Sequence, residues 1–352
     1  MRIAIVNDLR LAQEILRHAI GQIPGASVAW VAADGREAVQ KCKDDRPDLL
    51  LMDMVMPIMD GAVATRAIMK QYPCPVLVVT STIEGNLALV YEALSAGAID
   101  AVHTPTLGPN GTVLGVDALA RKARVALAAT AVQISRTMPQ TIVVNRPTST
   151  SKAAGLTNLP LVAIGSSTGG PHALAVVLRA LATAPPCCVV IVQHIDVAYA
   201  PGLAQWLTGE IKRPVTVGVH GEALRLGAIV VASTADHLVV QNGCVRYVAD
   251  PLDQIFRPSV DVFFASVVQE RITPSVAILL TGMGRDGAQG MRSLRDSGWH
   301  TIAQDQATSV VWGMPGSAVE MGGASEILPL DQIGAAASRI LHSRFANLGQ
   351  HR

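Results

Sequence analysis

The chain has 352 residues, of which 50% are hydrophobic, 16% are charged and 3% are aromatic. Its 28 basic and 27 acidic residues give a formal net charge of +1, which argues against a protein held on nucleic acid by phosphate contacts. The apolar content argues against extensive disorder, and a chain of this length is expected to form two domains.

The sequence gives no sign of a targeting or membrane segment. Asp8 and Arg10 interrupt the N-terminal apolar run too early for a signal peptide. The longest stretch nearly free of charge, residues 153–178, is broken by proline and glycine and does not resemble a membrane span. The five cysteines lack disulfide or zinc spacing. We therefore expect a cytoplasmic protein with free thiols that does not insert into membranes.

The first third of the chain alternates short apolar runs with amphipathic segments. Strands are predicted at residues 3–6, 28–32, 49–52, 76–80 and 101–103. Strands alternating with helices are typical of a parallel sheet covered on both faces. A long helix is predicted over residues 114–133. We place a doubly wound, five-stranded parallel α/β domain at residues 1–125.

The pattern fails over the next segment, which is rich in threonine and proline, so residues 126–157 are predicted to be a linker. The alternation then resumes, with strands predicted at residues 161–165, 189–193, 215–219, 228–232, 237–241, 276–281 and 300–303. Residues 215–247 show no clear helix between strands. We expect a second α/β domain at residues 158–345, doubly wound and mainly parallel, with an antiparallel hairpin insertion.

Two acidic residues follow predicted strands of the first domain. Asp8 follows the first strand and Asp53 follows the third, so both are expected at the carboxyl edge of the sheet. Carboxylates that meet there repel unless a cation lies between them, and Mg²⁺ is suited to this position. A carboxylate beside Mg²⁺ can attack a phosphoryl group. The alternative is structural: Asp8 caps a helix and Asp53 opens a turn.

The surroundings of Asp53 resemble the receiver domain of two-component response regulators. The resemblance rests on Asp53-Met54-Val55-Met56-Pro57-Ile58-Met59-Asp60-Gly61, the strand at 76–80 and Gly97-Ala98-Ile99-Asp100. It implies a flavodoxin-like fold and phosphorylation of Asp53 by a histidine kinase, with Thr80 sensing the phosphoryl group. It also implies a Mg²⁺ site made by Asp8, Asp53 and the backbone of Val55.

Two positions depart from the receiver pattern. Asn7 stands where receivers usually carry an acid, and Thr104 stands where they usually carry a lysine before a proline. Asn7 can offer Mg²⁺ an amide oxygen, directly or through water, but it lacks the negative charge, so the affinity for Mg²⁺ is expected to fall. Thr104 cannot supply the cation that would pair with Asp53 and its phosphate.

The second domain opens with an apolar strand, a glycine-rich turn and a helix. Gly165-Ser166-Ser167-Thr168-Gly169 fits G-x-S-x-G with Ser167 at its centre. Such a turn exposes the serine and directs backbone N–H groups at charge that develops beside it. Two alternatives remain: a phosphate cradle at a helix N-terminus, and a plain structural turn.

A serine nucleophile needs a histidine base and an acid that orients the base. His194 ends the apolar strand after the turn, which places it at the same sheet edge as Ser167. His172 is expected to point away, and His237 and His300 open predicted strands and are expected nearer the other end. Asp286 follows the strand at 276–281. The competing acid, Asp305, also follows a strand.

Together these segments resemble the chemotaxis protein-glutamate methylesterases. The matching segments are Ile164-Gly165-Ser166-Ser167-Thr168-Gly169-Gly170-Pro171, Gln193-His194, Arg257-Pro258-Ser259-Val260-Asp261, Leu280-Thr281-Gly282-Met283-Gly284-Arg285-Asp286-Gly287 and Trp312-Gly313-Met314-Pro315. The resemblance implies hydrolysis of γ-glutamyl methyl esters on the cytoplasmic helices of chemoreceptors, with release of methanol, and deamidation of receptor glutamines.

The same resemblance implies residue roles and partners. Ser167 is the nucleophile, His194 the base and Asp286 its orienter, and the backbone N–H of Met283 is a candidate oxyanion donor. The implied partners are chemoreceptors and a chemotaxis-type histidine kinase, and the esterase domain is expected to need no cofactor. Asn7 and Thr104 suggest the branch of the family that serves alternative chemosensory pathways.

The predicted receiver is joined to the predicted esterase by a polar linker. We therefore hypothesise that the receiver blocks the esterase site until Asp53 is phosphorylated. Two other functions remain open from sequence. One is an effector domain that binds a nucleotide with the glycine-rich loop, and the other is a catalytically silent scaffold that binds receptors.

Overall fold

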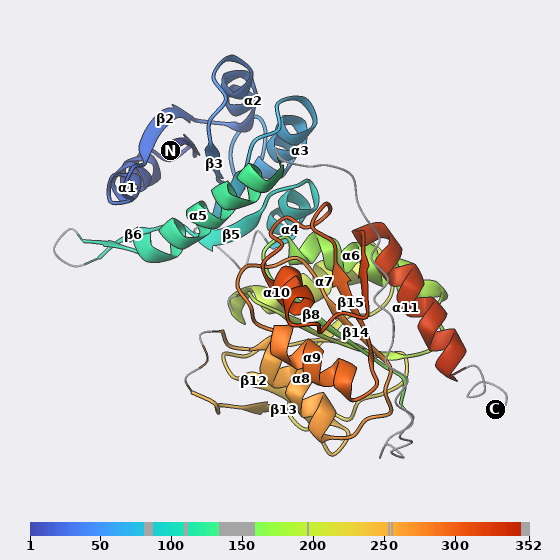
Figure 1. Cartoon of the computed structure of the whole chain (residues 1–352). Coiled ribbons are helices and arrows are strands. Elements are labelled where there is room, and N and C mark those ends of the chain that lie inside the picture. The colour runs from blue at the N-terminus through green and yellow to red at the C-terminus, as the bar shows by residue number, and fades with distance from the viewer. Residues whose placement is uncertain are drawn as a thin grey trace. The chain divides into compact units, whose positions relative to one another are not determined.

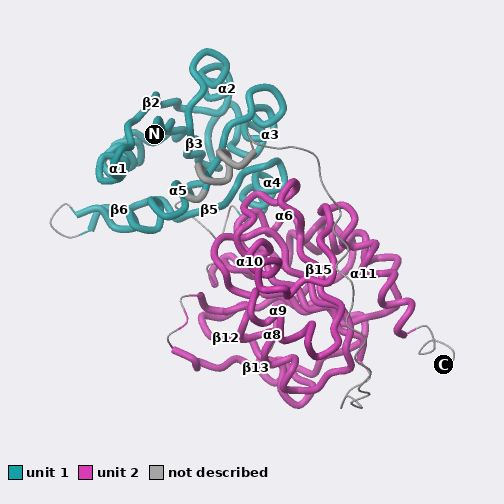
Figure 2. Tube along the Cα trace, viewed as in Figure 1, with its two compact units in different colours: residues 1–136 teal, residues 137–352 magenta. Residues whose placement is uncertain are grey.

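The computed structural model describes residues 1–80, 87–108, 112–133, 159–195, 197–252, 254 and 256–345. Helices surround parallel sheets in both halves of the chain, so the predicted α/β class is confirmed (Figure 1). The chain divides into two compact units, residues 1–136 and 137–352 (Figure 2). Most of the predicted linker lies outside the described residues, so its bounds stay a prediction.

The first unit contains the predicted five-stranded parallel sheet, in the order β2-β1-β3-β4-β5. Its strands are β1 (Arg2–Val6), β2 (Ser27–Ala32), β3 (Leu49–Met52), β4 (Val76–Thr80) and β5 (Asp100–His103). Its helices are α1 (Arg10–Gly21), α2 (Gly35–Asp44), α3 (Gly61–Gln71), α4 (Leu87–Ser95) and α5 (Val116–Gln133). A short antiparallel pair, β6 (Thr106–Leu107) and β7 (Val113–Leu114), precedes α5.

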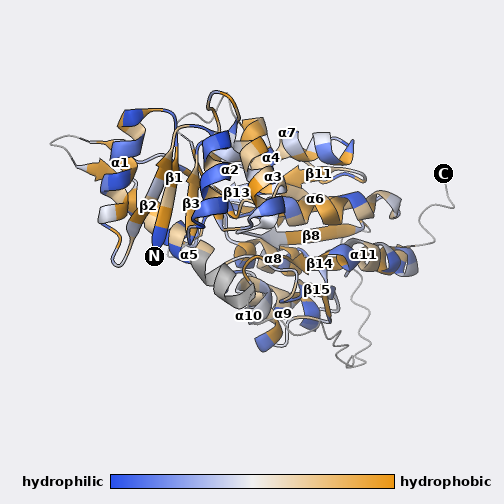
Figure 3. Ribbon diagram, turned by 90° about the horizontal axis from the view of Figure 1, so that it is seen from above, coloured by the Kyte–Doolittle hydropathy of each residue, from blue (hydrophilic) through white to orange (hydrophobic). Residues whose placement is uncertain are grey.

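The first sheet forms where the sequence is continuously apolar. All four residues of β3 are buried, as are all five of β4. Acidic side chains cap the N-termini of two helices. Asp34 accepts backbone N–H groups at the start of α2, and Asp60 accepts one at the start of α3. Helix α1 contacts α5, whereas α3 contacts α2 and α4, so the helices form two layers. Figure 3 shows hydrophobic strands β1 and β3 and hydrophilic stretches on α1 and α2.

The second unit is built on seven parallel strands in the order β10-β11-β9-β8-β14-β15-β16. These strands are β8 (Leu161–Ser166), β9 (Cys188–Gln193), β10 (Thr216–Val217), β11 (Ile229–Val231), β14 (Val276–Leu279), β15 (His300–Gln304) and β16 (Glu326–Leu328). The helices are α6 (Gly170–Ala180), α7 (Ala200–Ile211), α8 (Val260–Gln269), α9 (Ala288–Asp296), α10 (Met314–Glu320) and α11 (Leu330–Phe345), with 3-10 turns η2 (Leu181–Thr183) and η3 (Val197–Tyr199).

The helices of the second unit also form two layers. Helix α6 packs against α7 and α11, while α9 packs against α8 and α10. The central strands β8, β9 and β14 are buried along their whole length. The carboxyl ends of these three neighbouring strands therefore meet at one edge of a rigid, covered sheet.

The predicted antiparallel hairpin is confirmed within residues 215–247. It pairs β12 (His237–Gln241) with β13 (Cys244–Val248), and these are the only antiparallel strands in the described part of the second unit. Strands β10 and β11 instead join the main sheet in parallel, although no helix connects them. The connection between them is a loop that bridges to Cys244, and a loop crossover leaves no helical period in the sequence.

The cysteines are unpaired, as expected, and four of the five are buried. No helix in the described ranges combines the length and the apolar character that crossing a membrane requires.

Candidate active site

Ser167 lies in the tight turn between β8 and α6. Its backbone N–H donates to the carbonyl of Thr281 over 3.0 Å, and its carbonyl accepts from Gly170 over 2.8 Å. The left-handed residue of this turn is Gly169, at φ 78°. A Cβ at that position would lie 2.6 Å from the Val310 side chain, so the turn requires glycine for both its conformation and its packing.

The sheet register brings the three predicted catalytic residues to one edge. Strand β8 lies between β9 and β14, with Ser166 opposite Gln193. Ser167 and His194 each follow directly. Asp286 lies in the loop after β14, and a Cβ on Gly282 in that loop would come within 2.8 Å of the Ser167 Cβ. The loop after β14 is therefore packed against the serine turn.

His194 and Asp286 form a buried pair. The His194 Nε2 lies 2.7 Å from the Asp286 Oδ2, and each side chain is 7% exposed. The Phe256 ring stacks on the imidazole, with centroids 4.3 Å apart and an interplanar angle of 6°. Because Nε2 faces a carboxylate, it carries the hydrogen, and the second nitrogen, Nδ1, holds a lone pair.

The Nδ1 of His194 is buried and has no hydrogen-bond partner among the described residues. A buried polar atom without a partner is costly in a folded protein, and such atoms gather at functional sites. This nitrogen can accept a proton from a nucleophile. The Ser167 hydroxyl makes no bond to it here, and catalytic contacts are often long before substrate binds.

Asp286 is fixed by the N-terminus of α8. Its Oδ1 accepts the Ser259 hydroxyl at 2.8 Å and the Asp261 N–H at 2.9 Å, while its Oδ2 accepts the Val260 N–H at 2.7 Å. Burial alone would raise the pKa of Asp286, but the hydrogen bond from His194, the charge of this ring when it is protonated, and the backbone N–H groups hold this pKa below its ordinary value. The carboxylate therefore stays ionised beside the imidazole.

Asp261 completes a reciprocal arrangement of two helices. It lies in the first turn of α8, and its carboxylate accepts the Gly290 N–H at 2.7 Å at the start of α9. Burial, with the neighbouring charge of Asp286, raises the pKa of Asp261 to about 6. Asp286 thus caps α8, the helix that contains Asp261, and Asp261 caps α9, the helix that follows Asp286. These two caps fix the loop of Asp286 in place.

Two backbone N–H groups near Ser167 are free to bind an oxyanion. Neither the Met283 N–H, predicted for this role, nor the Thr168 N–H donates a hydrogen bond within the described part of the chain. Thr168 follows Ser167 directly. Met283 follows Gly282, which packs against Ser167.

The competing residues lie elsewhere. Asp305 caps its own turn by accepting from Thr308, and His300 pairs with Glu326 at 2.9 Å. His172 is exposed. The expectation for His237 was wrong: it opens β12, which is not part of the main sheet, and its ring contacts Ser259, beside Asp286.

The acid pocket of the first unit centres on Asp53. Its Oδ1 accepts the Met54 N–H at 2.7 Å and its Oδ2 accepts the Asn7 amide at 2.9 Å. Burial, with the nearby charge of Asp8, raises the pKa of Asp53 to about 6. Thr80 is buried at the end of β4, and its carbonyl accepts the Thr104 N–H at 3.0 Å.

Two hydrogen bonds fix the side-chain amide of Asn7, and its oxygen contact to a metal stays a prediction. The Asn7 Oδ1 accepts the Leu9 N–H at 2.9 Å, and its amide nitrogen faces Asp53. Both bonds require this orientation, because Leu9 N–H can only donate and a carboxylate can only accept. Asn7 therefore acts as a neutral donor to Asp53.

The remaining acids still fit Mg²⁺. Asp53 and Asp8 repel each other at close range, and few carboxylates suffice for an ion that keeps several waters. No cluster of three or more His, Cys, Asp or Glu side chains suited to a metal occurs among the described residues. Asp8, Asp53 and the backbone of Val55 stay the predicted donors for this ion.

Comparisons with known proteins agree with both halves of this geometry. Residues 162–337 match the CheB methylesterase family model and residues 3–107 match the response regulator receiver domain model. A protein-glutamate methylesterase/protein-glutamine glutaminase 2 of Cupriavidus metallidurans is 46% identical over 95% of this chain and 96% of its own. The chain belongs to the CheB methylesterase family.

Other CheB relatives include a methylesterase/glutaminase of a group 3 operon in Pseudomonas putida, 45% identical over 95% of this chain and 97% of its own. The crystal structure of the Thermotoga maritima CheB methylesterase catalytic domain is 34% identical, covers 52% of this chain and 99% of its own, and gives a TM-score of 0.49.

Sequence reasoning missed several residues of this CheB-type site. Phe256 stacks on His194, Ser259 holds Asp286, and the Thr168 N–H donates to no group in the described ranges. Ser259 stood in a motif that had no assigned role. Nothing in the sequence marks Phe256, since its contact depends on the path of the loop before α8.

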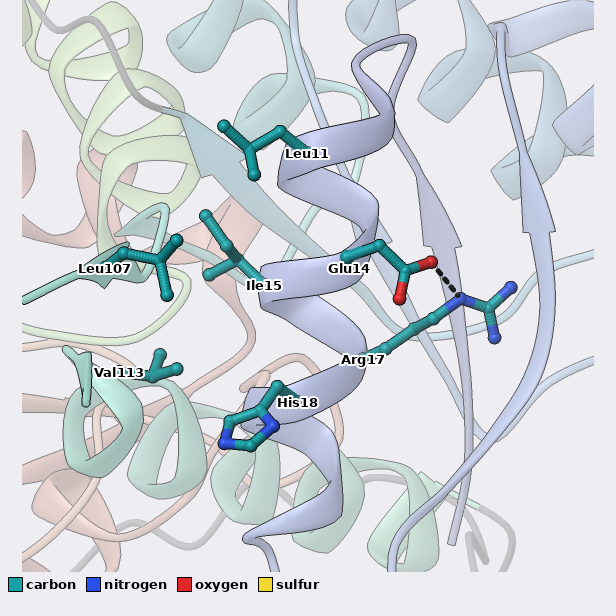
Figure 4. A pocket seen from close by; sticks show the side chains of 7 residues that line it. All are labelled: Leu11, Glu14, Ile15, Arg17, His18, Leu107 and Val113. Carbon is teal, nitrogen blue, oxygen red and sulfur yellow. Dashed lines mark ion pairs between the residues drawn. The ribbon is translucent and has the colours of Figure 1, made fainter. Parts of the chain in front are cut away.

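The chain also has a groove of mixed polar and apolar lining in its first unit. It measures about 500 Å³ and lies between α1 and the β6–β7 pair (Figure 4). Leu11, Ile15, Leu107 and Val113 line it, and Glu14 pairs with Arg17 at its rim. None of the predicted catalytic or phosphorylation residues lines this groove.

Proposed function

We propose that this chain hydrolyses γ-glutamyl methyl esters on chemoreceptors with Ser167, His194 and Asp286, under the control of phosphorylation at Asp53. The observation that carries the proposal is the His194–Asp286 pair. It leaves one buried ring nitrogen without a partner among the described residues, at the sheet edge where Ser167 begins its turn. The names of the relatives support the substrate class.

The reaction follows from this arrangement. His194 Nδ1 accepts the proton of the Ser167 hydroxyl as the oxygen attacks the ester carbonyl carbon. The imidazolium that forms is stabilised by Asp286, which remains ionised. The proton then passes to the methoxy oxygen as the carbon–oxygen bond breaks, and methanol leaves. Water, deprotonated by the same nitrogen, attacks the acyl-enzyme and releases glutamate.

The charge that develops on the carbonyl oxygen needs donors fixed before the reaction. The free N–H groups of Thr168 and Met283 are suited to this, since both flank the serine turn and neither is bonded within the described part of the chain. The helix α6 begins at Gly170, so its N-terminus adds positive potential nearby.

The same residues support deamidation of glutamine. The amide carbonyl is attacked in place of the ester, and ammonia leaves with the proton held by His194. No further side chain is required, because the acyl-enzyme is identical in the two reactions.

Control by phosphorylation requires Asp53 to attack a phosphohistidine of a histidine kinase. Asp8, Asp53 and the backbone of Val55 would hold Mg²⁺, which offsets charge on the transferring oxygens when bound. Asn7 donates to Asp53 and orients its carboxylate. Thr80 and Thr104, bonded through their backbones, lie at the ends of the adjacent strands and would sense the phosphoryl group.

The experiment is methanol release from methylated receptor membranes, with and without a phosphodonor. We expect release that the phosphodonor raises, that Ser167→Ala abolishes and that Asp53→Asn makes insensitive to the donor. Undiminished release by Ser167→Ala would overturn the proposal. Ser166→Ala is the matched control, because its hydroxyl is buried and bonded to Gln193 at 2.6 Å.

A further inference from the structure

His237 is fully buried, and both nitrogens of its ring are bonded. The Ser259 N–H donates to Nδ1 at 3.1 Å, and Nε2 lies 3.1 Å from the carbonyl oxygen of Pro251. A backbone N–H can only donate and a carbonyl can only accept. The ring is therefore neutral and carries its hydrogen on Nε2.

Ser259 is hydrogen-bonded to both His237 and Asp286. Ser259 is the N-cap of α8, and its hydroxyl donates to the Asp286 Oδ1 at 2.8 Å. The next N–H groups, of Val260 and Asp261, complete the carboxylate's bonds. Strand β12 packs against α8, so His237 ties the start of this helix to the hairpin (Figure 1).

We propose that His237 is a positioning residue of the esterase, which acts through Ser259 on Asp286 and so on the orientation of His194. This inference rests on the proposed function. Ser259 and His237 are both 0% exposed, so water cannot replace their bond. When the bond is lost, the Ser259 N–H and hydroxyl must rearrange, and the carboxylate moves relative to the imidazole.

Two substitutions separate this role from a general contribution to the core. In His237→Asn the amide oxygen takes the place of Nδ1 and keeps the bond to Ser259. In His237→Gln the amide nitrogen takes the place of Nε2 and keeps only the bond to Pro251. A role in packing alone predicts similar rates for the two variants.

The full-length chain is assayed in two ways: methanol release, for kcat and KM, and the rate at which a fluorophosphonate labels Ser167. Displacements of about 1 Å near a reaction centre cost on the order of 100-fold in rate. We expect His237→Gln to lose about 10- to 100-fold in kcat and in labelling rate, with little change in KM. His237→Asn is expected to be about tenfold faster than His237→Gln.

A double-mutant cycle tests the route of the effect. In an Asp286→Ala background, His237→Gln is expected to have no further effect, because the group it positions is gone. Equal rates for the Asn and Gln variants, or additive losses in the cycle, overturn the inference.

Two further outcomes are distinguishable. If His237→Gln does not fold, His237→Leu replaces it, because leucine also offers no acceptor to the Ser259 N–H. A kcat about tenfold below that of His237→Asn supports the inference, and equal rates for the two variants overturn it. If the wild-type chain releases no methanol and its Ser167 is not labelled, the proposed function itself fails, and the inference falls with it.

Discussion

Replacing Asp286 with asparagine tests the pair on which the proposed chemistry depends. The amide oxygen of Asp286→Asn can still accept from Ser259, as the Asp286 Oδ1 does. The amide nitrogen must then occupy the Oδ2 position, 2.7 Å from both the Val260 N–H and the His194 Nε2. An NH₂ group cannot accept from Val260, and it can bond His194 only as a donor.

The substitution therefore forces the opposite tautomer on the histidine. The hydrogen of His194 moves to Nδ1, and the nitrogen that should accept the proton of Ser167 is blocked. In a serine protease the equivalent change lowers kcat about 10⁴-fold, and we expect a loss of this order. It corresponds to about 5.5 kcal/mol of transition-state stabilisation.

The assay is steady-state methanol release, with the fluorophosphonate labelling rate as a measure independent of the receptor. Asp305→Asn is the matched control, since Asp305 caps its own turn and its amide can still accept from Thr308. We expect the control to stay within about threefold of wild type, because the asparagine oxygen keeps the bonds that Asp305 makes within its own turn. A loss below about tenfold for Asp286→Asn would refute the role of the pair.

Three other changes have expected outcomes. Gly169 has φ 78°, and an added Cβ would lie 2.6 Å from a neighbouring side chain, so Gly169→Ala should lose at least about 1–2 kcal/mol of unfolding free energy and most activity. The control Gly209→Ala, whose Cβ meets nothing within 4 Å, should lose neither. Equal melting temperatures for the two variants would contradict this. Asp261 has its pKa raised to about 6 in the folded state, so the stability it contributes is present below its unfolded value and is lost as pH rises through 6. At pH 8, Asp261→Asn should therefore have a free energy of unfolding up to about 3 kcal/mol above that of wild type, with the difference closing towards pH 4. A difference independent of pH in denaturant unfolding would count against the burial argument. Asn7→Asp adds a carboxylate to the acid pocket and should tighten Mg²⁺ binding by about tenfold in calorimetry, and an unchanged Kd would show that residue 7 does not face the ion.

The strands and the serine turn could be predicted because their cause is local. The apolar runs of β3, β4 and β8 are buried on both faces, and the glycines of the turn are required by its conformation. Strand ends then place Ser167, His194 and Asp286 at one edge by topology alone.

The rest depends on contacts that no pattern encodes. His237 looked remote because it opens a strand, yet β12 lies outside the main sheet and brings the ring to Ser259. The orientation of the Asn7 amide is set by the Leu9 N–H, and Phe256 reaches His194 by the path of a loop. No helix connects β10 to β11, so no helical period in the sequence indicates their parallel pairing.

The most direct test of the account is the site of covalent labelling in the full chain. A fluorophosphonate should modify one residue of the turn, Ser167, as located by peptide mass spectrometry, and the adduct should be lost in Ser167→Ala and strongly reduced in His194→Ala. The neighbouring Ser166 should stay unmodified, because it is buried and bonded to Gln193. An adduct on Ser166, or labelling of Ser167 that does not depend on His194, would contradict the account.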